Sequence, residues 1–416
     1  MKLHVSRHPR HALAPRGFNG MTIAAPAAVR VKADAWFEHL FGFSEAAALF
    51  AGRGLGGSAG LAAVCAKFEL AADGTLTSKV NGASYGSGNF STPSLAELRS
   101  EASGAALLAG EVTVRHVATP DVFELHTRPE FAGATFMAAS QFNTLEFASP
   151  GATPEDGVTG YVYDATQGPA CALAAPAATV VRNYLALVPA GRTGQSAIGQ
   201  SAAHQLNLLG ELLQLVQGSA GEAGSQPPPL VAVRNGYTSS DEARLRNFNA
   251  RLRGGRALSR EELAGALRVG LHSGVGVPWA SERFVLKPAA ERQVVSQVFC
   301  SALACGYSAG SLAAWEPLAR LVLEAAYEAT LLAALLEEPA EGARPPVVLI
   351  TFLGGGVFGN ADAWIETAIA RAVAKVRRLG AALDVVVTHH GRVDDTKATR
   401  LEQAIADGAL GGDEWC

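Results

Sequence analysis

Residues 347–360 read VVLITFLGGGVFGN, and a periodic helical pattern follows over 361–379. The apolar run predicts a buried strand, and the glycines predict a loop between that strand and the helix. Four of the six residues from 354 to 359 are glycines, which is more than a tight turn requires. Backbone N–H groups without side chains can approach an anion closely, so this segment predicts a cradle for a diphosphate.

A second interpretation of this segment stays open, namely a tight strand-to-helix turn without a ligand. Asn360 and Asp362 are residue types that commonly cap a helix, and either could begin the helix that follows. No Gly-Lys-Ser/Thr follows the glycines, which excludes a phosphate loop of the Walker type.

Apolar, strand-like runs alternate with helical patterns on the N-terminal and C-terminal sides of the glycine loop. The runs lie at 135–139, 230–234, 268–272, 294–304, 347–353 and 383–388, and the helical patterns at 196–217, 241–252, 259–268, 311–337 and 361–379. This alternation predicts an α/β fold with a mixed, mostly parallel sheet and helices on both faces. We expect the α/β domain at 129–416, with an enlarged middle at about 186–290. It follows a flexible basic extension (1–33) and an N-terminal α+β portion (34–128).

Polar residues gather in a second segment, where 140–147 read SQFNTLEF and 156–172 read DGVTGYVYDATQGPACA. The pattern predicts a strand end, an irregular loop and a small-residue helix, with Thr166 and Pro169 as start signals for the helix. Uncharged amides and hydroxyls suit ribose hydroxyls and a nucleobase. In the alternative interpretation, the same groups cap the helix and fix its loop.

Together the two segments resemble the macrodomain superfamily, which binds ADP-ribose and includes ADP-ribosyl hydrolases. In that family a strand ends in an Asn-bearing loop before a small-residue helix, and a later strand ends in a loop of the form Gly-Val/Ile-Phe/Tyr-Gly. Residues 356–359 match the latter form. The resemblance covers about 130–390 and implies that Asn143 faces the distal ribose. The full ligand-binding set that we expect is Asn143, Thr166, Gln167, Gly354, Gly355, Gly356, Val357, Phe358, Gly359 and Asn360.

The resemblance leaves open whether the protein hydrolyses an ADP-ribosyl bond or only reads ADP-ribose. The family's glycine run after the Asn and its Gly-Gly-Gly-Glu-Glu motif are both missing here. If hydrolysis occurs, Glu146, Asp156 and Asp164 are the carboxylates close enough in sequence to activate water or polarise the ribose.

A competing motif, GYSAG at 306–310, matches the G-x-S-x-G elbow of serine hydrolases. It follows a predicted strand and precedes a predicted helix, and the chain order Ser308, Asp362, then His389 or His390 would complete a triad. The alternative is that Ser308 or Ser311 caps the long helix.

Composition limits the classes of partner. The 416 residues are 49% hydrophobic and 17% charged, with a formal net charge of −4. This balance gives no strong signal for nucleic acid, and no run reaches the roughly 20 apolar residues that span a membrane. Five cysteines without a C-x-x-C pair favour a reducing, cytoplasmic setting. We expect no metal and no cofactor, and as partner ADP-ribose or an ADP-ribosylated macromolecule.

Overall fold

A computed structural model describes residues 28–53, 57–190, 196–218, 228–253, 258–337 and 344–408. Most of the predicted basic extension, residues 1–27, lies outside these ranges. No helix among the described residues is long and apolar enough to cross a membrane.

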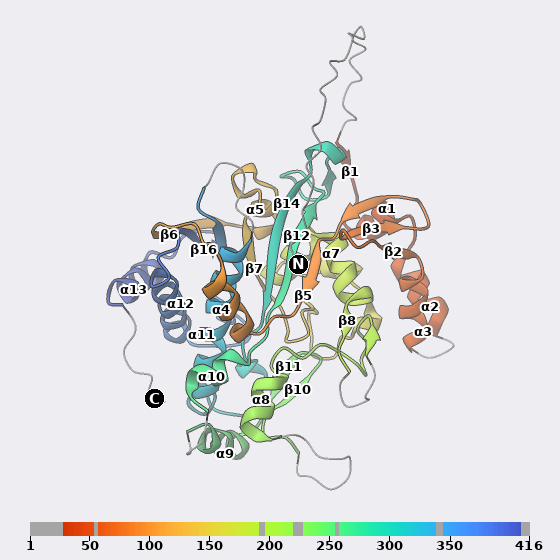
Figure 1. Ribbon diagram of the computed structural model, residues 1–416. Coiled ribbons are helices and arrows are strands. Elements are labelled where there is room, and N and C mark those ends of the chain that lie inside the picture. The colour runs from red at the N-terminus through yellow and green to blue at the C-terminus, as the bar shows by residue number, and fades with distance from the viewer. Residues whose placement is uncertain are drawn as a thin grey trace, which may run out of the picture.

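A seven-stranded sheet forms the centre of the molecule (Figure 1). Its strands, in spatial order, are β5 (Asn89–Ser91), β12 (Gly270–Val277), β14 (Gln293–Cys300), β7 (Thr135–Ala139), β15 (Val347–Ile350), β16 (Leu383–His390) and β6 (Val112–Thr119). The five strands from β14 to β6 run parallel, whereas β12 is antiparallel to both β14 and β5. The predicted mixed, mostly parallel sheet is therefore confirmed.

Side chains that alternate along the central strands enter two separate hydrophobic cores. In β16, Val385 and Val387 belong to one core, whereas Val386 belongs to the other. Since successive side chains of a strand point to opposite faces, both faces of the sheet must be covered. This explains why these strands read as continuous apolar runs in the sequence.

Helices cover both faces of the sheet (Figure 1). One core includes residues of α4 (Leu95–Gly104), α8 (Gly210–Gln217), α9 (Glu242–Arg253), α10 (Arg260–Gly265), α11 (Leu312–Leu336), α12 (Asp362–Arg377) and α13 (Asp395–Ala406). The other core includes residues of α1 (Trp36–Phe41), α2 (Glu45–Arg53), α3 (Gly57–Cys65), α5 (Val122–Thr127), α6 (Gln167–Ala174) and α7 (Pro176–Val180).

Within the described ranges, short strands form four small sheets outside the central one. They pair β1 (Val29–Arg30) with β13 (Val285–Leu286), β10 (Ala232–Arg234) with β11 (Tyr237–Ser239), β8 (Leu187–Val188) with β9 (Ala197–Ile198), and β2 (Phe68–Leu70) with β3 (Thr75–Ser78) and β4 (Ser84–Gly86). The helix predicted over 196–217 was wrong at its start, because β9 occupies 197–198 and α8 begins only at Gly210.

Residues 34–128 contribute two edge strands, β5 and β6, to the central sheet. Sequence periodicity could not show this, because strand pairing joins segments that are far apart in the chain. The division into an N-terminal portion and an α/β domain at residue 128 stays a prediction.

Candidate functional site at the carboxyl edge of the sheet

A two-lobed cleft lies where the parallel strands β7, β15, β16 and β6 end. Its first lobe has a volume of about 440 Å³ and contains Phe147, Tyr237, Tyr307, Phe352 and Phe358; we call it the aromatic lobe. The second lobe, of about 400 Å³, contains Thr119, Asp121, Thr388, His389 and His390; we call it the histidine lobe. Thr166, Gln167, Thr351 and Gly356 line both lobes, so the two lobes adjoin each other.

The glycine loop between β15 and α12 forms part of the wall between the lobes. The backbone amides of Gly354, Gly356, Val357 and Phe358 have no hydrogen-bond acceptor among the described residues. All four of these residues line the aromatic lobe. A loop with several unpaired N–H groups is a ready site for an anion, because each group can donate to a phosphate oxygen. The cradle stays a prediction, and these unpaired amides are the observation in its favour.

Other parts of the loop hold this arrangement in place. Gly354 and Gly359 have φ values of 75° and 70°, a left-handed conformation that favours glycine. The buried Asn360 side chain donates from Nδ2 to the carbonyl oxygen of Leu303, and the amide of Gly306 donates to that of Phe358. Asn360 thus fixes the loop, and the N-cap of α12 is Ala361 rather than Asn360 or Asp362.

Helix α11 also fixes the loop. The Tyr327 hydroxyl donates to the carbonyl oxygen of Thr351 at 2.6 Å and accepts from the amide of Leu353 at 2.9 Å. The helical pattern does not predict this contact, because nothing in it distinguishes Tyr327 from the surrounding core residues. The contact turns the chain away from the sheet directly before the glycines.

Glu146 lies at the wall of the aromatic lobe with a side chain that is 0% exposed. Its Oε1 accepts from Nη2 of Arg182 at 3.1 Å, and its Oε2 is buried without a hydrogen-bond partner among the described residues. Burial raises the pKa of Glu146 to about 7, although Arg182 acts in the opposite direction. A carboxyl group with this pKa can both take and give a proton near neutral pH.

The other predicted carboxylates have different surroundings. Asp164 lines the aromatic lobe, and its Oδ1 accepts from the amide and the hydroxyl of Thr166. Asp156 is exposed and does not line either lobe; its Oδ2 accepts from the amide of Thr153 at the start of a short helical turn. The structure therefore brings Glu146 and Asp164 together and leaves Asp156 in a capping role.

Asn143 lies behind the cleft rather than on its wall. Its side chain is 0% exposed, donates to Oε1 of Gln205 and accepts from the amide of Leu145. These bonds shape the loop that carries Glu146, so the ribose contact implied by the resemblance has no support in this geometry.

Thr166 and Gln167 lie where the two lobes meet. The Gln167 side chain accepts from the amide of Ala139 and donates to the carbonyl oxygen of Met137, each at 2.7 Å. It thus anchors the start of α6 to β7, while Thr166 is exposed to the cleft. Within the glycine loop, Gly355 and Gly359 do not line either lobe, because their amides close turns inside the loop.

The structure does not support the serine hydrolase alternative. The Ser308 hydroxyl donates to the carbonyl oxygen of Ser240 and accepts from the amide of the same residue. Asp362 pairs with Lys397, and His389 hydrogen-bonds His116 at 2.8 Å. Ser308, Asp362 and His389 are thus committed to other partners, and Ser311 caps α11.

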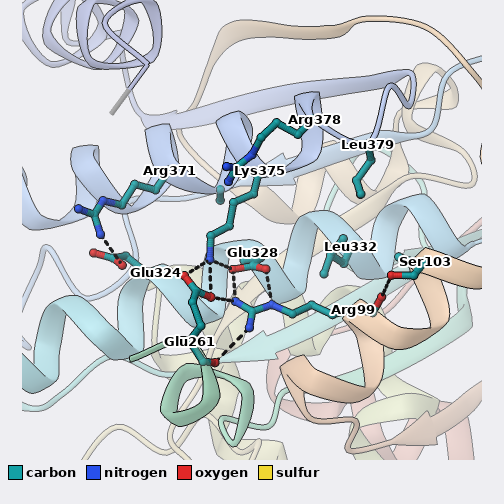
Figure 2. A pocket seen from close by; sticks show the side chains of 12 residues that line it. Arg99, Ser103, Glu261, Glu324, Glu328, Leu332, Arg371, Lys375, Arg378 and Leu379 are labelled. Carbon is teal, nitrogen blue, oxygen red and sulfur yellow. Dashed lines mark hydrogen bonds and ion pairs between the residues drawn. The ribbon is translucent and has the colours of Figure 1, made fainter. Parts of the chain in front are cut away.

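Another cavity, of about 570 Å³, lies away from this cleft among α4, α10, α11 and α12 (Figure 2). Glu261 and Glu328 each pair with both Arg99 and Lys375, as Figure 2 shows. The third carboxylate, that of Glu324, pairs with arginines from α10 and α12. Because these charges satisfy one another, we interpret the cavity as part of an ion-pair network that joins four helices.

No group of three or more potential metal ligands occurs among the described residues. The fold and the cleft define an α/β protein with a glycine loop of unpaired amides and a buried carboxyl group at the carboxyl edge of its sheet.

No protein-family model and no curated protein matches the chain. Among solved structures, it is similar to a poly(ADP-ribose) glycohydrolase from Deinococcus radiodurans in complex with ADP-ribose. The identity is 10%, with 77% of this chain and 96% of that chain covered and a TM-score of 0.38. It is also similar to a poly(ADP-ribose) glycohydrolase from Thermomonospora curvata bound to the inhibitor ADP-HPD, at 13% identity, 86% and 98% coverage and a TM-score of 0.38.

Proposed function

We propose that this protein binds ADP-ribose, free or attached to a macromolecule, and hydrolyses the bond that attaches it. The observation that carries the proposal is the row of four unpaired amides at 354–358, which adjoins both lobes of the cleft. If a diphosphate binds these amides, the two groups that it joins extend in opposite directions, one into each lobe. ADP-ribose has this form, because a diphosphate joins its adenosine half to its distal ribose.

The lobes differ in chemistry, which gives the ligand a direction. The aromatic lobe contains Glu146 and Asp164, so we place the distal ribose there. The adenosine half then occupies the histidine lobe. Thr166, at the junction, is placed to donate to a ligand hydroxyl or phosphate oxygen.

Glu146 is the proposed acid-base group. Its carboxylate takes a proton from a water molecule, the water oxygen forms a bond to C1 of the distal ribose, and the bond from C1 to the leaving group breaks. The leaving group receives the proton, and free ADP-ribose is the product. A pKa near 7 suits both halves of this transfer.

The test is incubation of the protein with a mono-ADP-ribosylated protein, followed by measurement of released ADP-ribose. We expect release by the wild type and at least a hundredfold slower release by Glu146→Gln, consistent with the usual contribution of about 10²–10⁴ from general acid-base catalysis. Glu316→Gln, at a surface ion pair on α11, is the control and should keep full activity. Binding without release by the wild type would instead identify a non-catalytic reader.

A further inference from the structure

Arg182 is a fully buried arginine behind the cleft that no motif in the sequence singles out. It lies in a π-helical turn, Val181–Leu185, and its side chain is 0% exposed. Its Nε donates to the carbonyl oxygen of Thr144, and its Nη2 donates to Glu146 and to the hydroxyl of Thr179. The guanidinium group also stacks on the ring of Phe299, 3.6 Å from the ring centroid.

These contacts hold both the side chain of Glu146 and the backbone of the loop that carries it. Through Nη2, Arg182 holds one carboxylate oxygen of Glu146 and leaves the other oxygen without a partner. Through Nε, it holds the backbone at Thr144, whose φ of 65° is uncommon for a non-glycine residue. From the other side, the Tyr161 hydroxyl accepts from the amide of Glu146. The carboxylate therefore has one bound oxygen and one buried oxygen that has no hydrogen-bond partner among the described residues.

The other titratable groups that face the Glu146–Arg182 pair do not supply a second positive charge. Burial raises the pKa of Tyr161 and of Cys171 well above their ordinary values, so both are neutral near pH 7. Burial lowers the pKa of His272, which lies toward Arg182 from β12, well below its ordinary value. Among these neighbours, Arg182 is thus the one cation that stabilises the Glu146 anion.

We propose that Arg182 is a positioning residue for Glu146, which holds one carboxylate oxygen and the loop backbone so that the other oxygen serves the reaction. Arg182 acts through Glu146 and does not touch substrate. This inference rests on the proposed function, because it assigns the residue that prepares the acid-base group for that hydrolysis.

The first test is the pH profile of kcat/KM with a mono-ADP-ribosylated protein as substrate. Without the guanidinium, the Glu146 anion loses its cation, so in Arg182→Gln the acidic limb should move upward by at least about one pH unit. We expect kcat to fall about a hundredfold while the Kd for ADP-ribose changes less than about threefold. Arg182→Lys keeps the charge and should restore part of the shift, and Arg320→Gln at the surface of α11 is the control.

A second measurement separates the inference from the proposed function and needs no activity. The Glu146 carboxyl carbon is titrated by NMR in protein labelled at glutamate, with Glu146→Gln to assign its signal. A higher pKa in Arg182→Lys or Arg182→Gln than in the wild type supports the positioning role, even if no form releases ADP-ribose; in that case only the proposed hydrolysis fails. An unchanged Glu146 pKa, or an unmoved acidic limb in an active Arg182→Gln protein, overturns the inference.

Discussion

Glu146 combines three properties at the residue scale: complete burial, a single ion pair and a position at the wall of the cleft. Burial of an ionised group costs free energy, and one hydrogen-bonded cation only partly offsets this cost. A carboxyl group in this state is destabilising for the fold, which is typical of residues retained for chemistry rather than stability.

The raised pKa of Glu146 makes the free energy of unfolding depend on pH. The pKa of Glu146 is about 7 in the folded protein, against an ordinary value of 4.5, so the folded state binds the proton more tightly. The stabilisation from this proton is complete below about pH 4.5 and is lost as the pH rises toward 7. Urea unfolding should show that the wild type loses about 2–3 kcal/mol relative to Glu146→Gln between about pH 5 and pH 8. If the unfolding free energies of the two proteins changed equally with pH, this result would contradict the assigned pKa.

Gly356 offers a test of the cradle that does not disturb the fold. A Cβ at this position would meet no atom within 4 Å, yet the residue lines both lobes. Gly356→Ala should therefore fold normally and weaken ADP-ribose binding about tenfold, or about 1.4 kcal/mol, because the methyl group obstructs the unpaired amides. Gly104→Ala at the end of α4, which also meets no atom, is the matched control. Equal affinity of both variants in calorimetry would argue against a ligand at the loop.

Residue-scale prediction from sequence succeeded where composition alone carried the signal. Four glycines after an apolar strand predicted the loop, and unpaired amides are found there. Asn143 was different, because an amide can bind a ligand or stabilise a loop, and only its hydrogen bonds to Gln205 and Leu145 show the latter. Arg182 left no signal, because its partner lies 36 positions away along the chain.

At the scale of elements, the sequence predicted the bounds of the strand-loop-helix units better than the tertiary contacts that these units make. β7 begins and ends as expected from its apolar run, and α11 and α12 lie within their predicted patterns. The short helix α6 starts at Gln167, and its Gly168 passes so close to the end of β7 that a Cβ would lie 2.0 Å from the carbonyl oxygen of Ala139. Such an approach depends on tertiary packing, which a periodic pattern does not contain.

The N-terminal helices hold the loop that borders the cleft. Glu45 of α2 is 3% exposed and accepts from the amides of Val158 and Thr159, from the Thr159 hydroxyl and from the Tyr184 hydroxyl. Three of these four donors belong to the loop that leads to Asp164, so the carboxylate joins α2 to that loop. This contact gives residues 34–53 a role in shaping the site.

Removing the Glu45 charge should loosen this loop. Glu45→Gln places an NH₂ group against N–H and O–H donors, so we expect a loss of about 2–3 kcal/mol of unfolding free energy. Hydrogen exchange should become faster over 153–164, while Glu38→Gln on the exposed side of α1 leaves it unchanged. Unaltered exchange in this segment of a folded Glu45→Gln protein would show that α2 does not hold the loop.

At the scale of the whole molecule, the parallel strands from β14 to β6 place loops from distant parts of the chain at one sheet edge. The carboxyl ends of adjacent parallel strands are a common position for ligand sites in α/β proteins. Here β7 supplies the acidic loop and β15 supplies the glycine loop, and the two strands pair directly. The order of the strands, rather than any one motif, therefore creates the two-lobed cleft.

The most direct measurement is isothermal titration calorimetry of the wild-type protein with ADP-ribose, ADP and ribose 5-phosphate. A diphosphate on the glycine loop with one half in each lobe predicts that ADP-ribose binds at least about tenfold more tightly than either fragment. It also predicts that Gly356→Ala weakens the binding of ADP-ribose. No heat with ADP-ribose at millimolar concentration, or equal affinity for ADP-ribose and ribose 5-phosphate, would contradict this account.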